Sequence, residues 1–200
     1  MRKKIAVIEL LKYNLRYLAY FFFAQSFFSV TFVLLKNQQM RTIFITDINE
    51  IESIINQCNV CYVGMVETDG SPYVIPMNFG YANREIILHS APEGKHLNAL
   101  ALNNRVCITF SHEHKLVYQH PDVACSYSML SKSVLCKGVV RFIDDLDEKE
   151  TKLNVLMKNY TDRPFKYSKP ALANVKVWSV QVDEMTSKAF GQNFKNQSDL

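Results

Sequence analysis

Residues 133–143, SVLCKGVVRFI, form an eleven-residue stretch rich in β-branched and aromatic side chains. Such a stretch predicts a β-strand. Most strands in globular proteins have five or six residues, so one of this length is typical of a barrel wall. The stretch therefore predicts a β-rich fold built around one long strand.

Five further strands are expected on either side of it. Asp69-Gly70 and Asn83 are turn signals, and they predict that the first three of these strands are joined to one another by hairpin turns. Residues 112–130 are polar and aromatic and stay unassigned. The five expected strands are 59–67 (NVCYVGMVE), 72–82 (PYVIPMNFGYA), 85–90 (EIILHS), 105–110 (RVCITF) and 175–184 (VKVWSVQVDE).

Short helices are expected between some strands, because apolar residues recur there at helical spacing. Thr46 or Asp47 can cap the first helix, with Glu50 as capping-box partner. No βαβ rhythm and no phosphate-binding glycine loop is present, so we expect a mainly β, six-stranded antiparallel barrel with a few flanking helices. The apolar faces are Ile48, Ile51, Ile54 and Ile55; Leu97 and Leu100; and Leu153, Leu156, Met157 and Tyr160.

The first 39 residues differ in composition from the predicted domain at 40–200. Tyr17–Leu35 is uncharged and nineteen residues long, just enough to span a membrane, and a basic flank precedes it. A signal peptide fits less well, because no small-residue cleavage site follows. The third explanation, which we favour, is a translated leader before a true start at Met40. We expect contact with a membrane only if residues 17–35 form a genuine membrane-spanning anchor.

Charge and cysteine usage limit the classes of partner. Six of the 23 basic residues but one of the 19 acidic residues lie in 1–39, which leaves 40–200 with a net charge of −1. Nucleic-acid binding through a basic surface is therefore not expected. Five cysteines, an odd number, indicate reduced thiols and a cytoplasmic protein.

Residues 88–100, LHSAPEGKHLNAL, place polar and basic side chains where a strand passes into a helix. Helix capping accounts for part of this pattern, with Ser90 as N-cap, Pro92 in the first turn and Glu93 as capping-box partner. It does not account for His89, Lys95 or His96. A lysine and a histidine in a first turn add charge and donors where an anion would bind, so an anion site is the second interpretation.

The domain resembles the FMN-binding split-barrel proteins, in the pyridoxamine 5′-phosphate oxidase-like branch that includes the nitroimidazole-resistance proteins. The resemblance runs in order over about 42–191. It implies a homodimer with FMN in clefts at the subunit interface. It rests on YVIPMNFGY (73–81), LHSAPEGKHLNAL (88–100), NNRVCITF (103–110), ACSYSM (124–129), KSVLCKGVVRFIDD (132–145), LMKNYT (156–161) and VQVDEMTSKAFG (180–191).

The resemblance also implies the site residues. The strand beside the flavin ring would contribute Val74, Ile75, Pro76, Met77 and Asn78; His89, Ser90, Lys95 and His96 would hold the phosphate; and Ser133 would approach the ring from another side.

Two departures from the family pattern bear on function. The family usually has two Arg or Lys residues where this chain has Lys95 and His96, so phosphate binding here is expected to be weaker or pH-sensitive. The C-terminal tryptophan and arginine of true pyridoxamine-phosphate oxidases have no counterpart in residues 189–200, which disfavours vitamin B6 oxidation.

The function that we expect is FMN-dependent reduction of small electron-poor molecules such as nitroaromatics. A nitroreductase-like oxidoreductase of this kind would use His89 as a candidate proton donor. The alternative is a non-catalytic flavin- or haem-binding protein for storage or sensing.

Other residue clusters carry weaker expectations. His112, His114 and His120 lack a further convergent ligand, so we expect no metal site. The CxxC of Cys58 and Cys61 is expected to fill the start of a buried strand, and Cys125 is likewise expected to pack.

Overall fold

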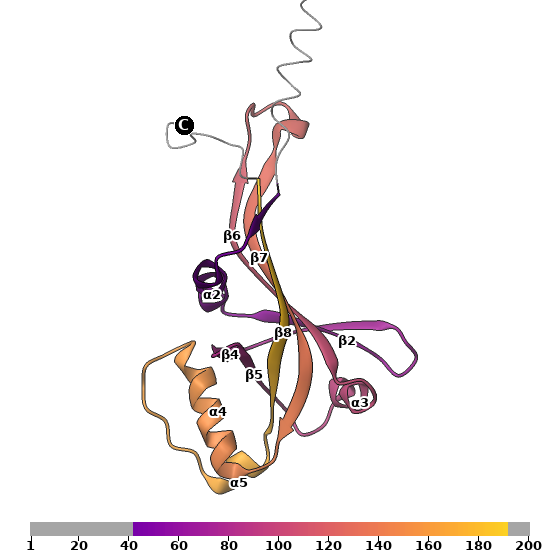
Figure 1. Cartoon of the computed structure of the whole chain (residues 1–200), viewed down its shortest axis with the longest axis vertical. Coiled ribbons are helices and arrows are strands. Elements are labelled where there is room, and N and C mark those ends of the chain that lie inside the picture. Colours follow the sequence, from indigo (N-terminus) through magenta and orange to yellow (C-terminus); the bar gives the residue numbers. More distant parts are fainter. Residues whose placement is uncertain (1–41, 192–200) are drawn as a thin grey trace, which may run out of the picture. The chain divides into compact units, whose positions relative to one another are not determined.

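The computed structural model describes residues 42–191 (Figure 1). The predicted segment 1–39, including Tyr17–Leu35, lies outside the described residues. No helix among residues 42–191 is long and apolar enough to cross a membrane. In chain order the elements are β1 (Ile43–Ile45), α2 (Ile48–Asn56), β2 (Cys61–Val66), β3 (Pro72–Met77), β4 (Phe79–Ala82), β5 (Glu85–Ser90), α3 (Lys95–Leu102), β6 (Arg105–Val117), η1 (Ala124–Ser126), β7 (Ser128–Ile143), α4 (Leu146–Lys158), α5 (Lys169–Ala173) and β8 (Lys176–Phe190).

The fold is mainly β, as predicted, with one antiparallel sheet of eight strands. Its order is β3-β2-β6-β7-β8-β5-β4, and β1 pairs with β8 beside this path. The predicted single strand 72–82 is divided at Asn78. Its first half, β3, pairs with β2, and its second half, β4, pairs with β5. The division and the short β1 account for eight strands rather than six.

The two halves of the predicted strand lie at opposite ends of the strand order, since β3 and β4 are its terminal members. Consecutive edge strands of one sheet are joined here by the single residue Asn78. The chain therefore passes from one edge of the sheet to the other at Asn78. This junction, which we call the seam, closes the sheet on itself.

Three long strands, β6, β7 and β8, form the centre of the sheet (Figure 1). The strand predicted at 105–110 is longer in the structure, because β6 continues through 112–117 after a β-bulge. Glu113 has φ +57° at that bulge. The pairing of β7 with β8 also shifts in register, between Lys137 and Gly138. Bulges let long strands bend, as barrel closure requires.

The predicted hairpin turns are confirmed. Gly70 has φ +86° between β2 and β3, and the Asp69 carboxylate accepts the amide of Ser71 at 2.9 Å. Asn83 and Arg84, with φ of +53° and +59°, form the tight turn between β4 and β5. Positive φ at both central residues is the requirement of a type I′ two-residue hairpin turn.

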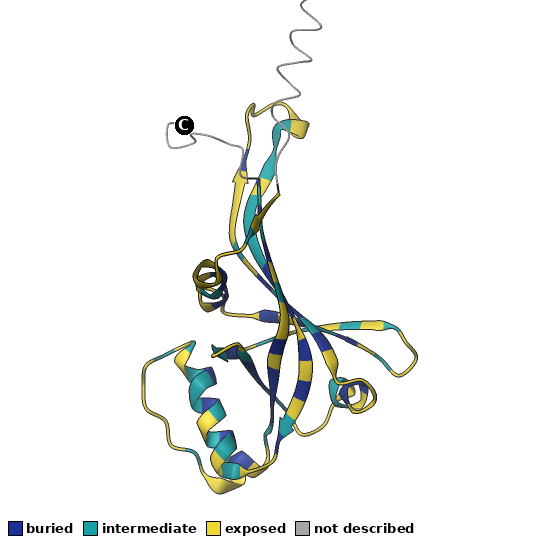
Figure 2. Ribbon diagram, viewed as in Figure 1, coloured by how far each residue is buried: buried dark blue, intermediate teal, exposed yellow. Residues whose placement is uncertain are grey.

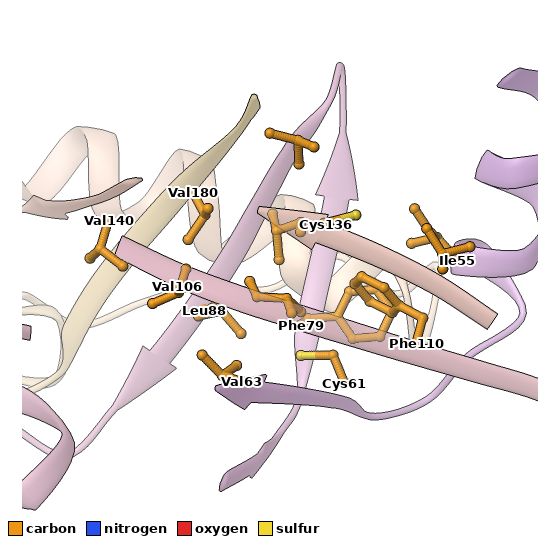
Figure 3. Close-up of a cluster of buried hydrophobic side chains, with 14 of the residues drawn as sticks. Ile55, Cys61, Val63, Phe79, Leu88, Val106, Phe110, Cys136, Val140 and Val180 are labelled. Atoms are coloured by element: carbon orange, nitrogen blue, oxygen red, sulfur yellow. The ribbon is translucent and has the colours of Figure 1, made fainter. Parts of the chain in front are cut away.

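Two apolar clusters lie on opposite faces of the sheet. The larger cluster fills the barrel interior and includes Ile55 of α2 (Figure 3). Ala99 and Leu100 of α3 also belong to it. The smaller cluster packs Ile87 and Val177 of the sheet against Leu153 and Leu156 of α4 and Leu172 of α5. Both faces of β8 are covered at residues 177–180, which are all buried, whereas buried and exposed residues alternate at 136–141 of β7 (Figure 2).

The helices follow the predicted apolar faces, with two differences. Asp47 caps α2 by accepting the Asn49 amide at 2.9 Å, as expected, whereas Ile48 is exposed. Tyr160 lies beyond α4, which ends at Lys158.

Candidate functional site

The start of α3 is connected to the β2–β3 hairpin through Lys95. Its Nζ lies 2.8 Å from a carboxylate oxygen of Glu67, just after β2, and 5.1 Å from the ring centroid of Tyr73 in β3. The Lys95 side chain is 62% exposed. The structure thus brings the predicted basic turn and the predicted ring-binding strand together.

The predicted residues of β3 divide between its two faces. Val74 is 59% exposed and Pro76 is also exposed, whereas Ile75 and Met77 pack against the barrel core. Residues at alternate positions of a strand point to opposite faces. Only Val74 and Pro76 of these four therefore present side chains to the outer face, and the side chains of Ile75 and Met77 face the barrel core.

The outer face of the sheet also includes Ser133. Pro76 pairs with Tyr62, Tyr62 with Thr109, and Thr109 with Leu135, so these side chains share a face. Ser133 lies two residues before Leu135 and on the same face. Asn78 is exposed at the seam. The prediction that Ser133 and β3 face the same region is thus consistent with the sheet register.

His96 lies on the barrel side, beside Trp178 of β8. Their ring centroids are 6.5 Å apart and their planes are 23° apart. Nε2 of His96 and Nε1 of Trp178 are both buried, and neither has a hydrogen-bond partner among residues 42–191. Buried nitrogens without partners are uncommon and costly, so they indicate where a water molecule or a ligand would bind.

Gly94 makes room for the His96 ring. It is the N-cap of α3 and has φ +152°. A Cβ at this position would lie 2.7 Å from Cε1 of His96, closer than any ordinary contact. Glycine is therefore required for the position that the imidazole adopts.

The helix-capping interpretation of residues 90–93 was wrong. Ser90 is the last residue of β5, and its hydroxyl donates to the carbonyl of Ala91 at 3.0 Å. Helix α3 begins five residues later, at Lys95, and Gly94 provides no side-chain cap. Its first-turn amide groups are thus left without a side-chain acceptor, which suits an anion.

A second cation near Ser90 was missed by the sequence analysis. Lys176 of β8 is the register partner of Ser90, and its Nζ lies 3.0 Å from Asp144 and 5.1 Å from the centroid of the Phe142 ring. Lys176 is the first residue of β8, and the alternation that marked this strand gave no sign of the pairing. Only the register between β5 and β8 reveals it.

His89 is separated from Ser90 and His96 by the sheet. Leu88 pairs with Trp178 on the barrel side, whereas His89 pairs with Val177 on the side of α4 and α5. Nδ1 of His89 is buried, without a partner in the described part of the chain. The four predicted phosphate-binding residues are thus divided into Ser90, Lys95 and His96 on one side and His89 on the other.

The electrostatics of the α3 start are unusual for a helix. Its first turn contains two potentially cationic residues, Lys95 and His96, and no acidic residue, although acidic residues are the ones that stabilise a helix start. The hydrogen bond to Glu67 raises the pKa of Lys95, which stays charged. Burial lowers the pKa of both His96 and His89, so both imidazoles are neutral at pH 7.

The remaining clusters are placed as follows. Cys61 is fully buried at the start of β2, as predicted, and burial raises the pKa of its thiol to about 12. Cys125 is exposed in η1, so the prediction that it packs was wrong. The bulge at Glu113 lies between His112 and His114 in β6.

The comparisons with known proteins show the family and the fold. A family model described as pyridoxamine 5′-phosphate oxidase matches residues 47–189. A structure of a candidate 5-nitroimidazole antibiotic resistance protein from Bacteroides thetaiotaomicron is 55% identical, with a TM-score of 0.71, and the match covers 77% of this chain and 90% of that one.

More distant structures share the fold. An FAD- and haem-binding protein from Mycobacterium smegmatis is 18% identical, with a TM-score of 0.67 over 78% of this chain and 77% of that one. The flavocytochrome Anf3 from Azotobacter vinelandii is 21% identical, with a TM-score of 0.64 over 73% and 68%. A search of the curated proteins gave no match.

Proposed function

The chain belongs to the pyridoxamine 5′-phosphate oxidase family, and from this membership we propose that it is an FMN-binding flavoprotein that reduces small electron-poor molecules such as nitroaromatics. The observation that carries the proposal is the cationic start of α3 against β3, in a chain 55% identical to a protein named for 5-nitroimidazole resistance.

The residues at this site fit a phosphate-bearing flavin. His96 has a buried nitrogen without a partner among the described residues, Lys95 has a charged and exposed ammonium, and the α3 start lacks a side-chain cap. The Lys95–Glu67 pair does not preclude this role, because the Lys95 side chain is 62% exposed and can turn from Glu67, which is 17% exposed, to another anion. In this proposal Ser90, Lys95 and His96 hold the phosphate.

The ring of the flavin is assigned to the outer face near the seam. Val74 and Pro76 would contact it through their side chains, Ile75, Met77 and Asn78 through their backbone, and Ser133 from β7. A bound flavin supplies the electron transfer, and the protein provides binding, orientation and proton transfer. His89 is the proposed proton donor in its protonated form, and because burial lowers its pKa that form is the minor one at pH 7.

The proposed homodimer would use the same outer face. On β2 and β3 this face is formed by uncharged residues, among them Tyr62, Val66 and Val74, which are 48%, 41% and 59% exposed. Apolar side chains grouped on one face of a sheet are typical of a surface that a partner covers. A second copy placed here would bring its own site next to the first.

The proposed location is the cytoplasm. All five cysteines, which lie between residues 58 and 136, are free thiols, and this is the state expected in a reducing compartment. A membrane location depends on residues 1–39. A chain that starts at Met40 should therefore remain dimeric and bind flavin without detergent if the apolar segment is dispensable.

The experiment that tests the cofactor compares FMN with riboflavin, which lacks the phosphate. We expect the purified chain to bind FMN at least tenfold more tightly than riboflavin, the effect of one charge-assisted contact. Equal affinity would place the phosphate elsewhere, and no binding of either flavin would refute the proposal.

A second experiment tests the reaction. The FMN-loaded protein is reduced under anaerobic conditions and mixed with a 5-nitroimidazole while flavin absorbance is recorded. Rapid reoxidation with loss of the nitro compound supports the reductase. Reduced flavin that stays reduced would favour the storage or sensing alternative.

The dimer is tested with Val74→Glu, which places a charge in the proposed interface. Light scattering should show a dimer for the natural chain and a monomer for the variant. Glu67→Gln, which alters charge at the hairpin end, should remain dimeric. A monomeric natural chain would contradict the shared-interface proposal.

A further inference from the structure

Tyr160 contacts both sides of the seam. Its hydroxyl accepts the amide of Phe79, the first residue of β4, at 2.9 Å and donates to the carbonyl of Asn59 at 2.9 Å. Asn59 lies two residues before β2, the neighbour of β3. A single hydroxyl can donate one hydrogen bond and accept others, so one group satisfies both backbone atoms.

The adjacent residue makes a parallel contact. Nδ2 of Asn159 donates to the carbonyl of Cys58 at 3.2 Å. The C-terminal end of α4 therefore holds the segment before β2 through two consecutive side chains. Tyr160 is the one of the two that also reaches β4.

The Phe79 amide is the peptide nitrogen that follows Asn78. Asn78 is the only residue between the two edge strands, and it has no register partner in the sheet formed by residues 42–191. An edge strand leaves part of its backbone unpaired, so the position of this peptide depends on groups outside the sheet. The Tyr160 hydroxyl is such a group.

We propose that Tyr160 is a positioning residue for the flavin site, because its hydroxyl fixes the Asn78–Phe79 peptide at the seam. The inference rests on the proposed function, in which Met77 and Asn78 present their backbone to the flavin ring. In this proposal Tyr160 bonds to the backbone of Phe79 and Asn59 rather than to the ring. It acts through the peptide whose groups would interact with the polar edge of the flavin.

The test compares Tyr160→Phe with Tyr81→Phe in the full chain. Tyr81 lies in β4, and its hydroxyl donates to Glu52 at 2.9 Å, so the control removes a tyrosine hydroxyl that bonds to neither Phe79 nor Asn59. Both variants should lose similar thermal stability without flavin. Tyr160→Phe alone should bind FMN about fivefold more weakly, as expected for one net hydrogen bond, and should shift the reduction potential of the bound flavin.

The outcomes are distinguishable. If both variants keep the natural FMN affinity and potential, or change them equally, Tyr160 has no special role in positioning. If the natural chain binds no FMN, the proposed function fails, and amide hydrogen exchange then tests the seam. Faster exchange of the Phe79 amide in Tyr160→Phe than in Tyr81→Phe would support the proposal that the Tyr160 hydroxyl fixes the Asn78–Phe79 peptide. Equal exchange in the two variants would overturn it.

Discussion

The imidazole of His96 lies beside the indole of Trp178, with 6.5 Å between ring centroids and 23° between ring planes. The two residues come from the first turn of α3 and from β8, and each has one buried nitrogen without a partner among the described residues. Trp178 is the only tryptophan of the chain, so its fluorescence reports on this site directly.

Stability should decrease when the pH falls below about 6.5. Burial lowers the pKa of His89 and His96 in the folded chain, whereas both are near 6.5 in the unfolded chain. Between those values the unfolded chain binds more protons, so protonation favours unfolding as the pH falls. Denaturant unfolding at pH 8, 7, 6 and 5 without flavin checks this. The double variant His89→Gln, His96→Gln should show a smaller decrease between pH 7 and 6, and an identical pH profile would contradict the assignment.

Replacing Lys95 by alanine should weaken FMN binding about tenfold, because a charge-assisted contact to the phosphate is lost. The matched control is Lys169→Ala, since Lys169 is also an exposed lysine at the first position of a helix. Quenching of Trp178 fluorescence by added FMN measures both affinities. Equal affinities in the two variants would mean that the phosphate does not bind at α3.

Replacing His89 by alanine should separate chemistry from binding. Its side chain faces α4 and α5 rather than Ser90 and His96, so FMN affinity should change by less than about twofold. Loss of a proton donor typically lowers turnover roughly 100-fold, and we expect that decrease for reduction of a nitroaromatic. Lost flavin with normal turnover per bound flavin would instead indicate a structural role.

The packing of α4 on β4 depends on Gly80. A Cβ at this position would overlap the backbone of Leu156 in α4, which cannot move without displacing the helix. Gly80→Ala should therefore destabilise the fold by roughly 3 kcal/mol and lower the melting temperature by about 6–12 °C. At Gly64 the nearest atom to an added Cβ is the Cys107 carbonyl oxygen at 3.2 Å, so Gly64→Ala should have a smaller effect. Equal melting temperatures would contradict the close approach of α4.

The sequence alone predicted where six strands, the helical faces and the hairpin turns lie, but not β1, the division at Asn78 or the full length of β6. These features follow from local chemistry: alternation of apolar residues marks 175–184, and Asp69-Gly70 and Asn83 allow the backbone angles of tight turns. The family resemblance likewise depends on the order of short motifs, which the linear chain contains in full. The family match to residues 47–189 confirms that part of the analysis.

Only the tertiary structure decided how the candidate residues are grouped. Local patterns favoured Ser90 as a helix cap, but the pairing of β5 with β8 extends the strand through Ser90 and delays the helix to Lys95. The same register places His89 on the opposite face from His96. It also brings Trp178 against His96, and the folding of α4 against the sheet brings Tyr160 to the seam. These contacts join residues far apart in the chain, and strand register, which a sequence pattern does not specify, sets which of them meet.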